Sequence, residues 1–167
     1  MSATTLVSVE EYLKTSFPDG DREYVDGRIV ERNLGEIDHA DLETSFAEYL
    51  RAHYKKFWTV VEVRVQVTAT RFRVPDVLSV MGPKPKGKVV TKPPFLVIEI
   101  LSPEDRPGEM QEKIDDYLAF GVKYVWVVNP RTRLGYIHTS QGSREAKDAL
   151  LRTQDPEIKV PLNQLFA

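Results

Sequence analysis

The sequence predicts a single α/β domain across residues 1–167, with a mixed central sheet flanked by helices. Three observations lead to this prediction. From Thr59 onward, apolar and polar residues alternate as in a half-buried strand. Residues 95–101 form an apolar run interrupted by one carboxylate, as in a central strand. Residues 108–120 then carry apolar side chains at helical spacing, and further strand-like segments follow.

The composition is that of a globular protein. Hydrophobic residues make up 41% and charged residues 29% of the chain, which disfavours disorder and coiled-coil or collagen-like structure. The absence of cysteine excludes disulfides, thiol catalysis and zinc–thiolate sites. No apolar run approaches the roughly 18 residues of a membrane span, and the first residues lack a secretory signal, so we expect a cytoplasmic protein without membrane contact. The chain has 23 Lys and Arg residues and 25 Asp and Glu residues, so it has no overall positive charge that would point to nucleic acid.

The N-terminal segment predicts a short helix and a hairpin. Ser8 and Glu11 have the spacing of a capping box, which opens a helix over residues 8–13. The hairpin strands cover residues 22–25 and 28–31, and the Asp-Gly pair between them suits a tight two-residue turn.

A second helix is predicted from Asp38, which can cap it, to about Lys56. Its apolar face is formed by Leu42, Phe46, Tyr49, Leu50 and His53. His39 lies in the first turn of this helix, where an imidazole can either cap the backbone or contact a phosphate.

Two strands and a basic loop follow. The first predicted strand covers residues 59–68 and the second residues 72–81. Pro75 places an edge or a bulge within the second strand, beside Asp76, because proline has no N–H for the ladder. The loop after this strand carries Lys84, Lys86, Lys88 and Lys92. These lysines either form a rim that attracts phosphates or are simply solvated.

The C-terminal half predicts a helix between strands. Met110, Ile114, Tyr117 and Leu118 form the apolar stripe of the helix over residues 108–120. Gly121 stands in the usual stop position. Strands are predicted at residues 123–129 and 133–138, joined by a turn at Asn129-Pro130.

Glu99 is the residue that most needs a chemical explanation. An ionised carboxylate inside an apolar strand is costly unless it is paired, protonated or bound to a metal; the alternative is a strand-end residue that faces water. Asp76 lies on the preceding strand, so the two carboxylates can meet there. Mg²⁺ suits such a site, because it accepts one or two carboxylates together with waters and phosphate oxygens.

Three short motifs in sequence resemble the PD-(D/E)xK nuclease superfamily with its restriction-endonuclease-like core. They are Val74-Pro75-Asp76, then Ile98-Glu99-Ile100, then a helix. A wider set of segments is similar to a stand-alone bacterial endonuclease-like family of unknown function within that superfamily. This set comprises Glu23 to Asp26-Gly27, His39, Pro75-Asp76, Glu99 to Ser102-Pro103, Lys113 to Tyr117 and Gly121 to Asn129-Pro130.

The resemblance implies Mg²⁺-dependent hydrolysis of phosphodiester bonds in nucleic acid, with DNA as the expected substrate and Mn²⁺ as an alternative metal. Asp76, Glu99 and the backbone carbonyl of Ile100 would hold the metal. Glu23 would be a third acid, either a ligand through water or an orienting group; its alternative is an exposed strand carboxylate. His39, Tyr117 and the lysines Lys84, Lys86 and Lys88 would contact the substrate.

One position departs from the superfamily pattern. A lysine ordinarily lies two residues after the glutamate, on the same strand face, but here that position is Leu101. Proteins of the superfamily can instead carry the lysine on the following helix, so the resemblance implies Lys113 as the replacement; Lys113 shares a helical face with Tyr117. The alternative for Lys113 is a solvated lysine beside the apolar stripe.

Two functional expectations follow. One site on a chain of this size meets a single strand of a duplex, so we expect a homodimer for double-strand cleavage. The competing reading is a noncatalytic nucleic-acid or protein-binding module that retains the nuclease fold, which Leu101 in place of the usual lysine keeps open.

Overall fold

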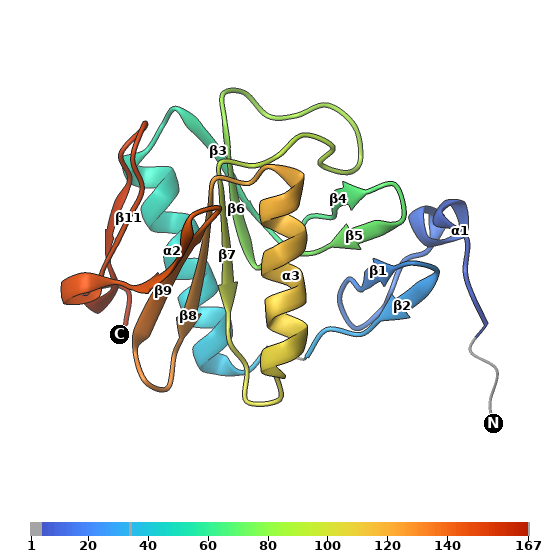
Figure 1. Ribbon diagram of the computed structural model, residues 1–167, viewed down its shortest axis with the longest axis horizontal. Coiled ribbons are helices and arrows are strands. Elements are labelled where there is room, and N and C mark those ends of the chain that lie inside the picture. Colours follow the sequence, from blue (N-terminus) through green and yellow to red (C-terminus); the bar gives the residue numbers. More distant parts are fainter. Residues whose placement is uncertain (1–4, 34, 167) are drawn as a thin grey trace.

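A six-stranded mixed sheet forms the centre of the computed structural model, which describes residues 5–33 and 35–166 (Figure 1). The strand order is β10-β9-β8-β7-β6-β3. In chain order these strands are β3 (Phe57–Val61), β6 (Val77–Met81), β7 (Leu96–Ile100), β8 (Tyr124–Asn129), β9 (Leu134–Thr139) and β10 (Gly142–Glu145). Together with its flanking helices, this sheet confirms the predicted α/β class.

Strands β7 and β8 are the one parallel pair in the described part of this sheet; the other neighbours are antiparallel. A parallel pair needs a long crossover, which helix α3 (Pro107–Phe120) supplies. The helix ends at Gly121, whose φ of 115° is left-handed and favours glycine. The predicted central strand, the helix after it and the two strands that follow are therefore confirmed.

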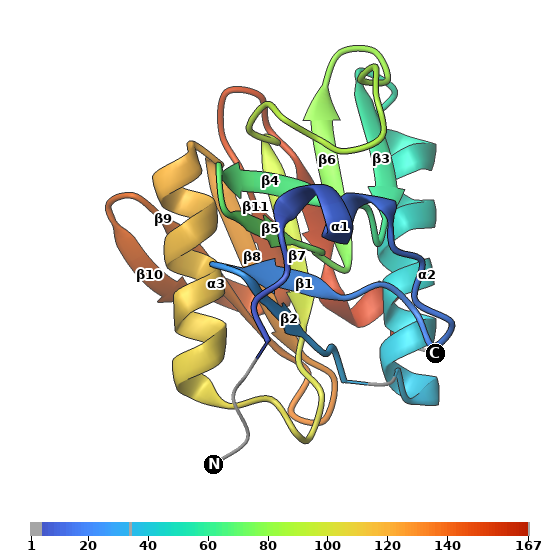
Figure 2. The same cartoon turned by 90° about the vertical axis from the view of Figure 1, so that its right-hand side faces the viewer.

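The two faces of the sheet are covered by different helices. Helix α2 (Ile37–His53) lies over one face and α3 over the other (Figure 2). Along β7, Leu96, Ile98 and Ile100 pack into the apolar cluster on the α2 side, while Val97 packs into the cluster on the α3 side. Because side chains alternate along a strand, Glu99 points to the α3 side.

A second sheet of four antiparallel strands stands beside the first, with the order β2-β1-β5-β4. Its strands are β1 (Glu23–Val25), β2 (Arg28–Val30), β4 (Val65–Thr68) and β5 (Arg71–Arg73), and the short helix α1 (Val9–Lys14) packs on it. Tyr12, Tyr24 and Phe72 form the apolar contact between them. Figure 2 shows this small sheet in front of the central one, between α2 and α3. The predicted capping box and hairpin are confirmed.

The two predicted strands at residues 59–68 and 72–81 are wrong as single strands. Each is divided between the two sheets: β3 and β6 pair in the central sheet, and β4 and β5 pair in the small one. The first break falls at Glu62, whose φ is 50°, and the second at Pro75, which has no N–H for a ladder. The alternation of valines continues across the first break, so periodicity alone did not reveal it.

Other differences are smaller. Helix α2 begins at Ile37 after the N-cap residue Glu36, so Asp38 lies within the first turn and does not cap the helix. A hairpin of β11 (Leu150–Arg152) and β12 (Lys159–Pro161), which the sequence analysis did not predict, extends the cluster on the α2 side. Within the described residues, no helix combines the length and apolarity that crossing a bilayer requires.

Candidate active site

Two buried carboxylates, Asp76 and Glu99, line the same pocket where β6 begins and β7 ends. The pairing of Val77 with Ile98 places Asp76, just before β6, next to the end of β7. The backbone N–H of Ile100 donates to the Asp76 carboxylate at 2.6 Å. Asp76 and Glu99 are 3% and 2% exposed, so the water-facing alternative for Glu99 is wrong. Both strands are interior to the sheet, so the carboxylates lie at strand ends within the sheet and not along one of its edge strands.

Glu99 is held by two residues of α3. The Tyr117 hydroxyl donates to one carboxylate oxygen at 2.7 Å, and the Lys113 ammonium lies 3.1 Å from the other. Burial raises the pKa of Glu99 to about 7, and the charges of Asp76 and Glu23 add to this against the opposing charge of Lys113. Glu99 is therefore a carboxyl whose charge depends on what binds beside it.

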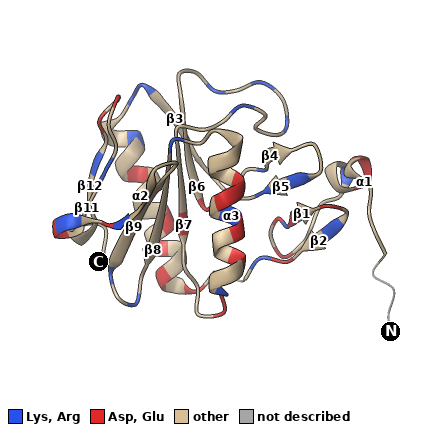
Figure 3. Ribbon diagram, viewed as in Figure 1, with Lys and Arg blue, Asp and Glu red and all other residues tan. Residues whose placement is uncertain are grey.

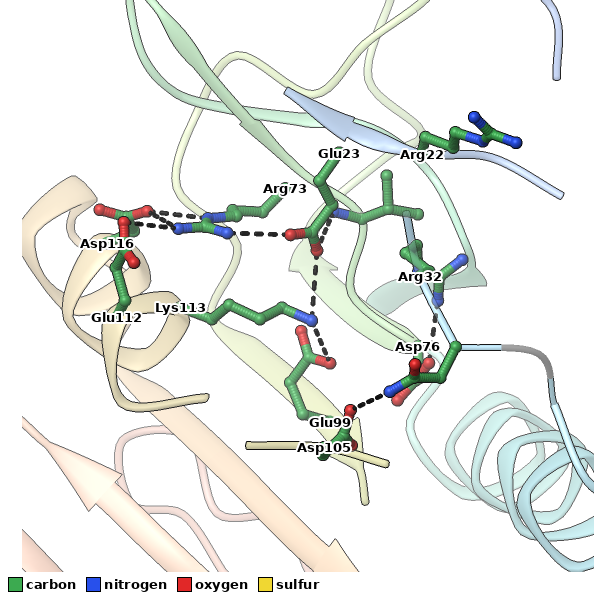
Figure 4. Close-up of polar contacts among 12 residues, drawn as sticks. Arg22, Glu23, Arg32, Arg73, Asp76, Glu99, Asp105, Glu112, Lys113 and Asp116 are labelled. Atoms are coloured by element: carbon green, nitrogen blue, oxygen red, sulfur yellow. Dashed lines mark hydrogen bonds and ion pairs between the residues drawn. The ribbon is translucent and has the colours of Figure 1, made fainter. Parts of the chain in front are cut away.

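Lys113 bridges the two sheets. Its ammonium lies 3.1 Å from Glu99 and 3.2 Å from Glu23, as the close-up shows (Figure 4). Burial opposes its charge, but the two carboxylates outweigh burial and raise the pKa of Lys113, so it stays protonated. Its side chain is only 16% exposed and lies against Glu99 and Glu23, so the alternative of a solvated lysine is wrong.

Glu23 is fixed by a buried arginine. One oxygen accepts from Arg73 at 2.9 Å, and the other accepts from the backbone N–H of Val74 at 3.2 Å. Burial favours the neutral acid, yet Lys113 and Arg73 together lower the pKa of Glu23. The exposed-carboxylate alternative is therefore wrong: Glu23 is an ionised, buried acid.

Arg73 ties this acid to helix α3. Its guanidinium also lies 2.7 Å from Asp116. Figure 3 shows the acidic residues of α3 beside the basic residues of β5, and neighbouring Arg71 pairs with Asp116 as well. A ladder of alternating charges therefore sets the position of α3, and with it that of Lys113.

A second group of possible metal ligands shares Asp76. One ligand atom each from His39, Glu43 and Asp76 lies within 4.8 Å of the others. The His39 Nε2 atom is 3.4 Å from Asp76. His39 Nδ1 and Glu43 Oε1 are buried without a hydrogen-bond partner, which an ion or a water would satisfy. Sequence reasoning missed Glu43; the spacing of four residues from His39 on one helix was the available signal.

Ionisation in this group depends on its neighbours. Burial raises the pKa of Glu43 to about 7, with Asp76 adding to the effect. Burial also acts against ionised Asp76, but the hydrogen bond and charge of His39 and the charges of Lys113 and Arg32 outweigh it and lower the pKa of Asp76. Asp76 therefore stays ionised. It belongs both to the carboxylate pair with Glu99 and to the group with His39 and Glu43.

Arg32, which the sequence analysis also missed, pairs directly with Asp76. Its guanidinium donates to Asp76 at 3.0 Å and to Glu62 at 3.0 Å. Glu62 has a left-handed backbone, uncommon for a residue other than glycine, and its N–H donates to the Asp76 carbonyl at 3.2 Å. Glu62, at the strained break between β3 and β4, therefore supports Asp76 in two ways. Its backbone N–H binds the Asp76 carbonyl, and its side chain holds the arginine that pairs with the Asp76 carboxylate.

Four of the predicted substrate-contact residues do not reach this site in the structure. Tyr117 is fully buried behind Glu99, where it can orient the carboxylate but not touch a substrate. Lys84, Lys86 and Lys88 are exposed in the loop that joins the end of β6 to the start of β7. Because β6 and β7 are antiparallel, this loop lies at the opposite end of the strand pair from Asp76 and Glu99.

A pocket of about 420 Å³ opens onto these residues. Seven carboxylate residues and five lysine or arginine residues line it. The charged lining comprises Glu23, Glu31, Asp76, Glu99, Asp105, Glu109 and Glu112, with Arg28, Arg32, Arg73, Arg106 and Lys113. The excess of acid favours a cation and disfavours a bare phosphate, so a bound metal would strengthen the binding of an anionic substrate in this pocket.

The raised pKa of Glu99 makes the free energy of unfolding depend on pH. In the metal-free protein, the folded state keeps a proton on Glu99 up to about pH 7, whereas the unfolded chain loses it near 4.5. The stabilisation is complete below pH 4.5 and is lost as the pH rises to about 7, at a cost of about 3 kcal/mol. Glu99→Gln should remove this loss. Urea unfolding in EDTA across this window measures it, and parallel pH curves for both proteins would contradict the assignment.

Comparisons with known proteins identify a family and a solved structure with the same fold. The Uma2 family, described as "Putative restriction endonuclease", matches residues 9–165. The solved structure of a "putative nuclease belonging to DUF820" from Anabaena variabilis ATCC 29413 superposes with a TM-score of 0.81 at 19% identity. The superposition covers 96% of this chain and 97% of that chain, which shows the same fold. No curated protein matches the sequence.

Proposed function

Because the chain belongs to the Uma2 family, which bears out the resemblance drawn from its motifs, we propose that it is a divalent-metal-dependent nuclease. It hydrolyses phosphodiester bonds, with DNA as the substrate. The observation that carries this proposal is the convergence of Asp76, Glu99 and Lys113, from two strands and a helix, on one acidic pocket.

The donor set fits a hard cation. Asp76 and Glu99 offer carboxylate oxygens, and the carbonyl of Ile100 stands beside them in sequence. His39 and Glu43 add the two unpartnered buried atoms on the other side of Asp76. Mg²⁺, or Mn²⁺ in its place, would lower the pKa of a bound water and offset the charge that builds on the phosphate.

The remaining residues position the reacting groups. Lys113 carries a permanent positive charge at the wall of the pocket, where it can hold the attacking water or a phosphate oxygen. Glu23 holds Lys113 in place, and Tyr117 fixes the orientation of Glu99. This chain therefore supplies its ammonium group from α3, although Leu101 occupies the usual lysine position.

The proposal extends to assembly. A single pocket acts on one strand at a time, so cleavage of both strands of a duplex is the work of a homodimer. Analytical ultracentrifugation with and without duplex DNA measures the oligomeric state directly.

A panel of DNA and RNA substrates, in single-stranded and duplex forms, tests the function. Wild-type protein should cleave members of the panel in Mg²⁺ or Mn²⁺ and none in EDTA. Glu99→Gln, which keeps the shape of the side chain, should be inactive under the same conditions. Metal-induced thermal stabilisation without cleavage of any substrate would instead support the noncatalytic binding module.

A further inference from the structure

Helix α3 leaves part of its own sheet face uncovered. Along β9, Ile137 packs into the cluster on the α2 side, so Tyr136 and His138 lie on the α3 side. Helix α3 packs on β8 and β4, and β9 is the next strand outward from β8. Tyr136 and His138 remain partly exposed there. A hollow of about 340 Å³ lies between β8, β9, the start of α3 and the loop that precedes it.

The hollow has an apolar floor and a basic rim. Met110, Ile114 and Val127 are buried at its floor, and Tyr136 supplies an aromatic ring. Its one acidic residue is Asp105. That carboxylate is already occupied, because one oxygen accepts from the backbone N–H of Ser102 at 2.8 Å and the other from the Asn33 side chain at 2.7 Å.

Two arginines form the rim. Arg106 precedes α3, and Arg131 lies in the turn between β8 and β9. Both side chains are exposed, and neither makes an ion pair or a side-chain hydrogen bond within residues 5–33 and 35–166. An apolar slot with an aromatic ring and two unpaired guanidinium groups matches a nucleotide, which offers a flat base and an anionic phosphate.

The hollow adjoins the acidic pocket. Ser102, Asp105, Arg106 and Met110 line both, so one short stretch of chain separates the two spaces. A strand whose phosphate reaches Asp76 and Glu99 therefore carries a neighbouring nucleotide past Arg106 and into the hollow.

We propose that this hollow is a nucleotide subsite that takes an unpaired base next to the scissile phosphate. The proposal rests on the nuclease function and adds a substrate class to it. A base within a duplex is stacked and paired, and extracting it costs free energy, whereas a single strand, flap or frayed end presents it freely. The protein therefore favours substrates with an unpaired nucleotide beside the cut. Stacking on Tyr136 tolerates every base, because each has a π-face.

Binding of a short fluorescent single-stranded DNA in EDTA tests the subsite without cleavage. Tyr136→Ala should weaken binding about tenfold, the effect of losing one stacked base, while Tyr136→Phe should retain it. Arg131→Gln should weaken binding and flatten its salt dependence. Arg133→Gln is the matched control, because Arg133 lies in the same turn but does not line the hollow. Affinity for a blunt duplex should be unchanged by Tyr136→Ala.

The outcomes separate this proposal from the nuclease function. The subsite is wrong if Tyr136→Ala and Arg131→Gln bind single-stranded DNA as tightly as the wild type and the Arg133→Gln control do. This holds even if the wild type cleaves DNA. Tyr136-dependent binding without cleavage in Mg²⁺ supports the subsite and counts against the nuclease. Arg131 is exposed in a turn, so its variant keeps the test valid if Tyr136→Ala does not fold. A Tyr136-dependent change in sedimentation, with unchanged DNA affinity, would make the hollow a protein interface and the subsite wrong.

Discussion

Asp76→Asn should lower metal-dependent cleavage about 1,000-fold or more and abolish the rise in Tm that Mg²⁺ or Mn²⁺ gives the wild type. Loss of one preorganised electrostatic contact already costs about 100- to 1,000-fold, and Asp76 belongs to both possible ligand groups. A metal that binds only the folded protein raises its Tm by mass action. Single-turnover cleavage and thermal melting, each with metal and with EDTA, measure the two effects.

The direction in which Asp76→Asn changes the Tm without metal follows from the lowered pKa of Asp76. A carboxyl whose folded pKa lies below its ordinary 3.8 stabilises the protein above that value and loses this contribution as the pH falls through the folded pKa. At neutral pH, Asp76→Asn should therefore melt below the wild type in EDTA. Asp116→Asn is the matched control: it removes the charge that pairs with Arg73 but should keep the metal response. Equal metal-induced shifts in wild type and Asp76→Asn would place the metal elsewhere.

Lys113→Met should reduce the single-turnover rate by about 100- to 1,000-fold, the range expected for the loss of one preorganised charged donor from an active site. Its metal-induced rise in Tm should be larger than that of the wild type. The reason is that Glu23 and Glu99 lose the cation between them, so a metal ion becomes their main source of positive charge. Methionine keeps the unbranched stem and the helix propensity.

The control for Lys113→Met is Lys113→Arg. Arginine keeps the charge between the two carboxylates, so this variant should melt closer to the wild type in EDTA. It should still cleave poorly, because a planar guanidinium does not replace a compact ammonium group. A Lys113→Met protein that cleaves at the wild-type rate would exclude the catalytic assignment of Lys113 while leaving that of Asp76 intact.

The parts of the fold that the sequence predicted are those with a strong local signal. The apolar run that became β7 and the stripe that became α3 each carry their pattern within one element. The break at Glu62 could not be predicted, because a left-handed backbone angle leaves the alternation of valines unchanged. Pro75 gave a local signal, but an irregularity does not reveal that the chain changes sheets there.

The candidate site divides in the same way. Asp76 and Glu99 drew attention because each stands against an apolar background, and Lys113 shares a helical face with Tyr117. Arg32 was missed because its partner Asp76 lies 44 positions further along the chain, and no local pattern reports such a pairing. The pKa of Glu99 also depends on burial that only the folded chain creates.

The ionic ladder through Arg73 has a consequence for when activity appears. Glu23 and Lys113 meet only when β1, β5 and α3 are together, and Lys113 lies 90 positions after Glu23 in the chain. Contacts this distant in sequence form late, because the entropy of closing the intervening loop must be overcome first. We expect Lys113 to reach its place beside Glu23 only late in folding, so that the proposed active site is completed after most of the remaining contacts have formed.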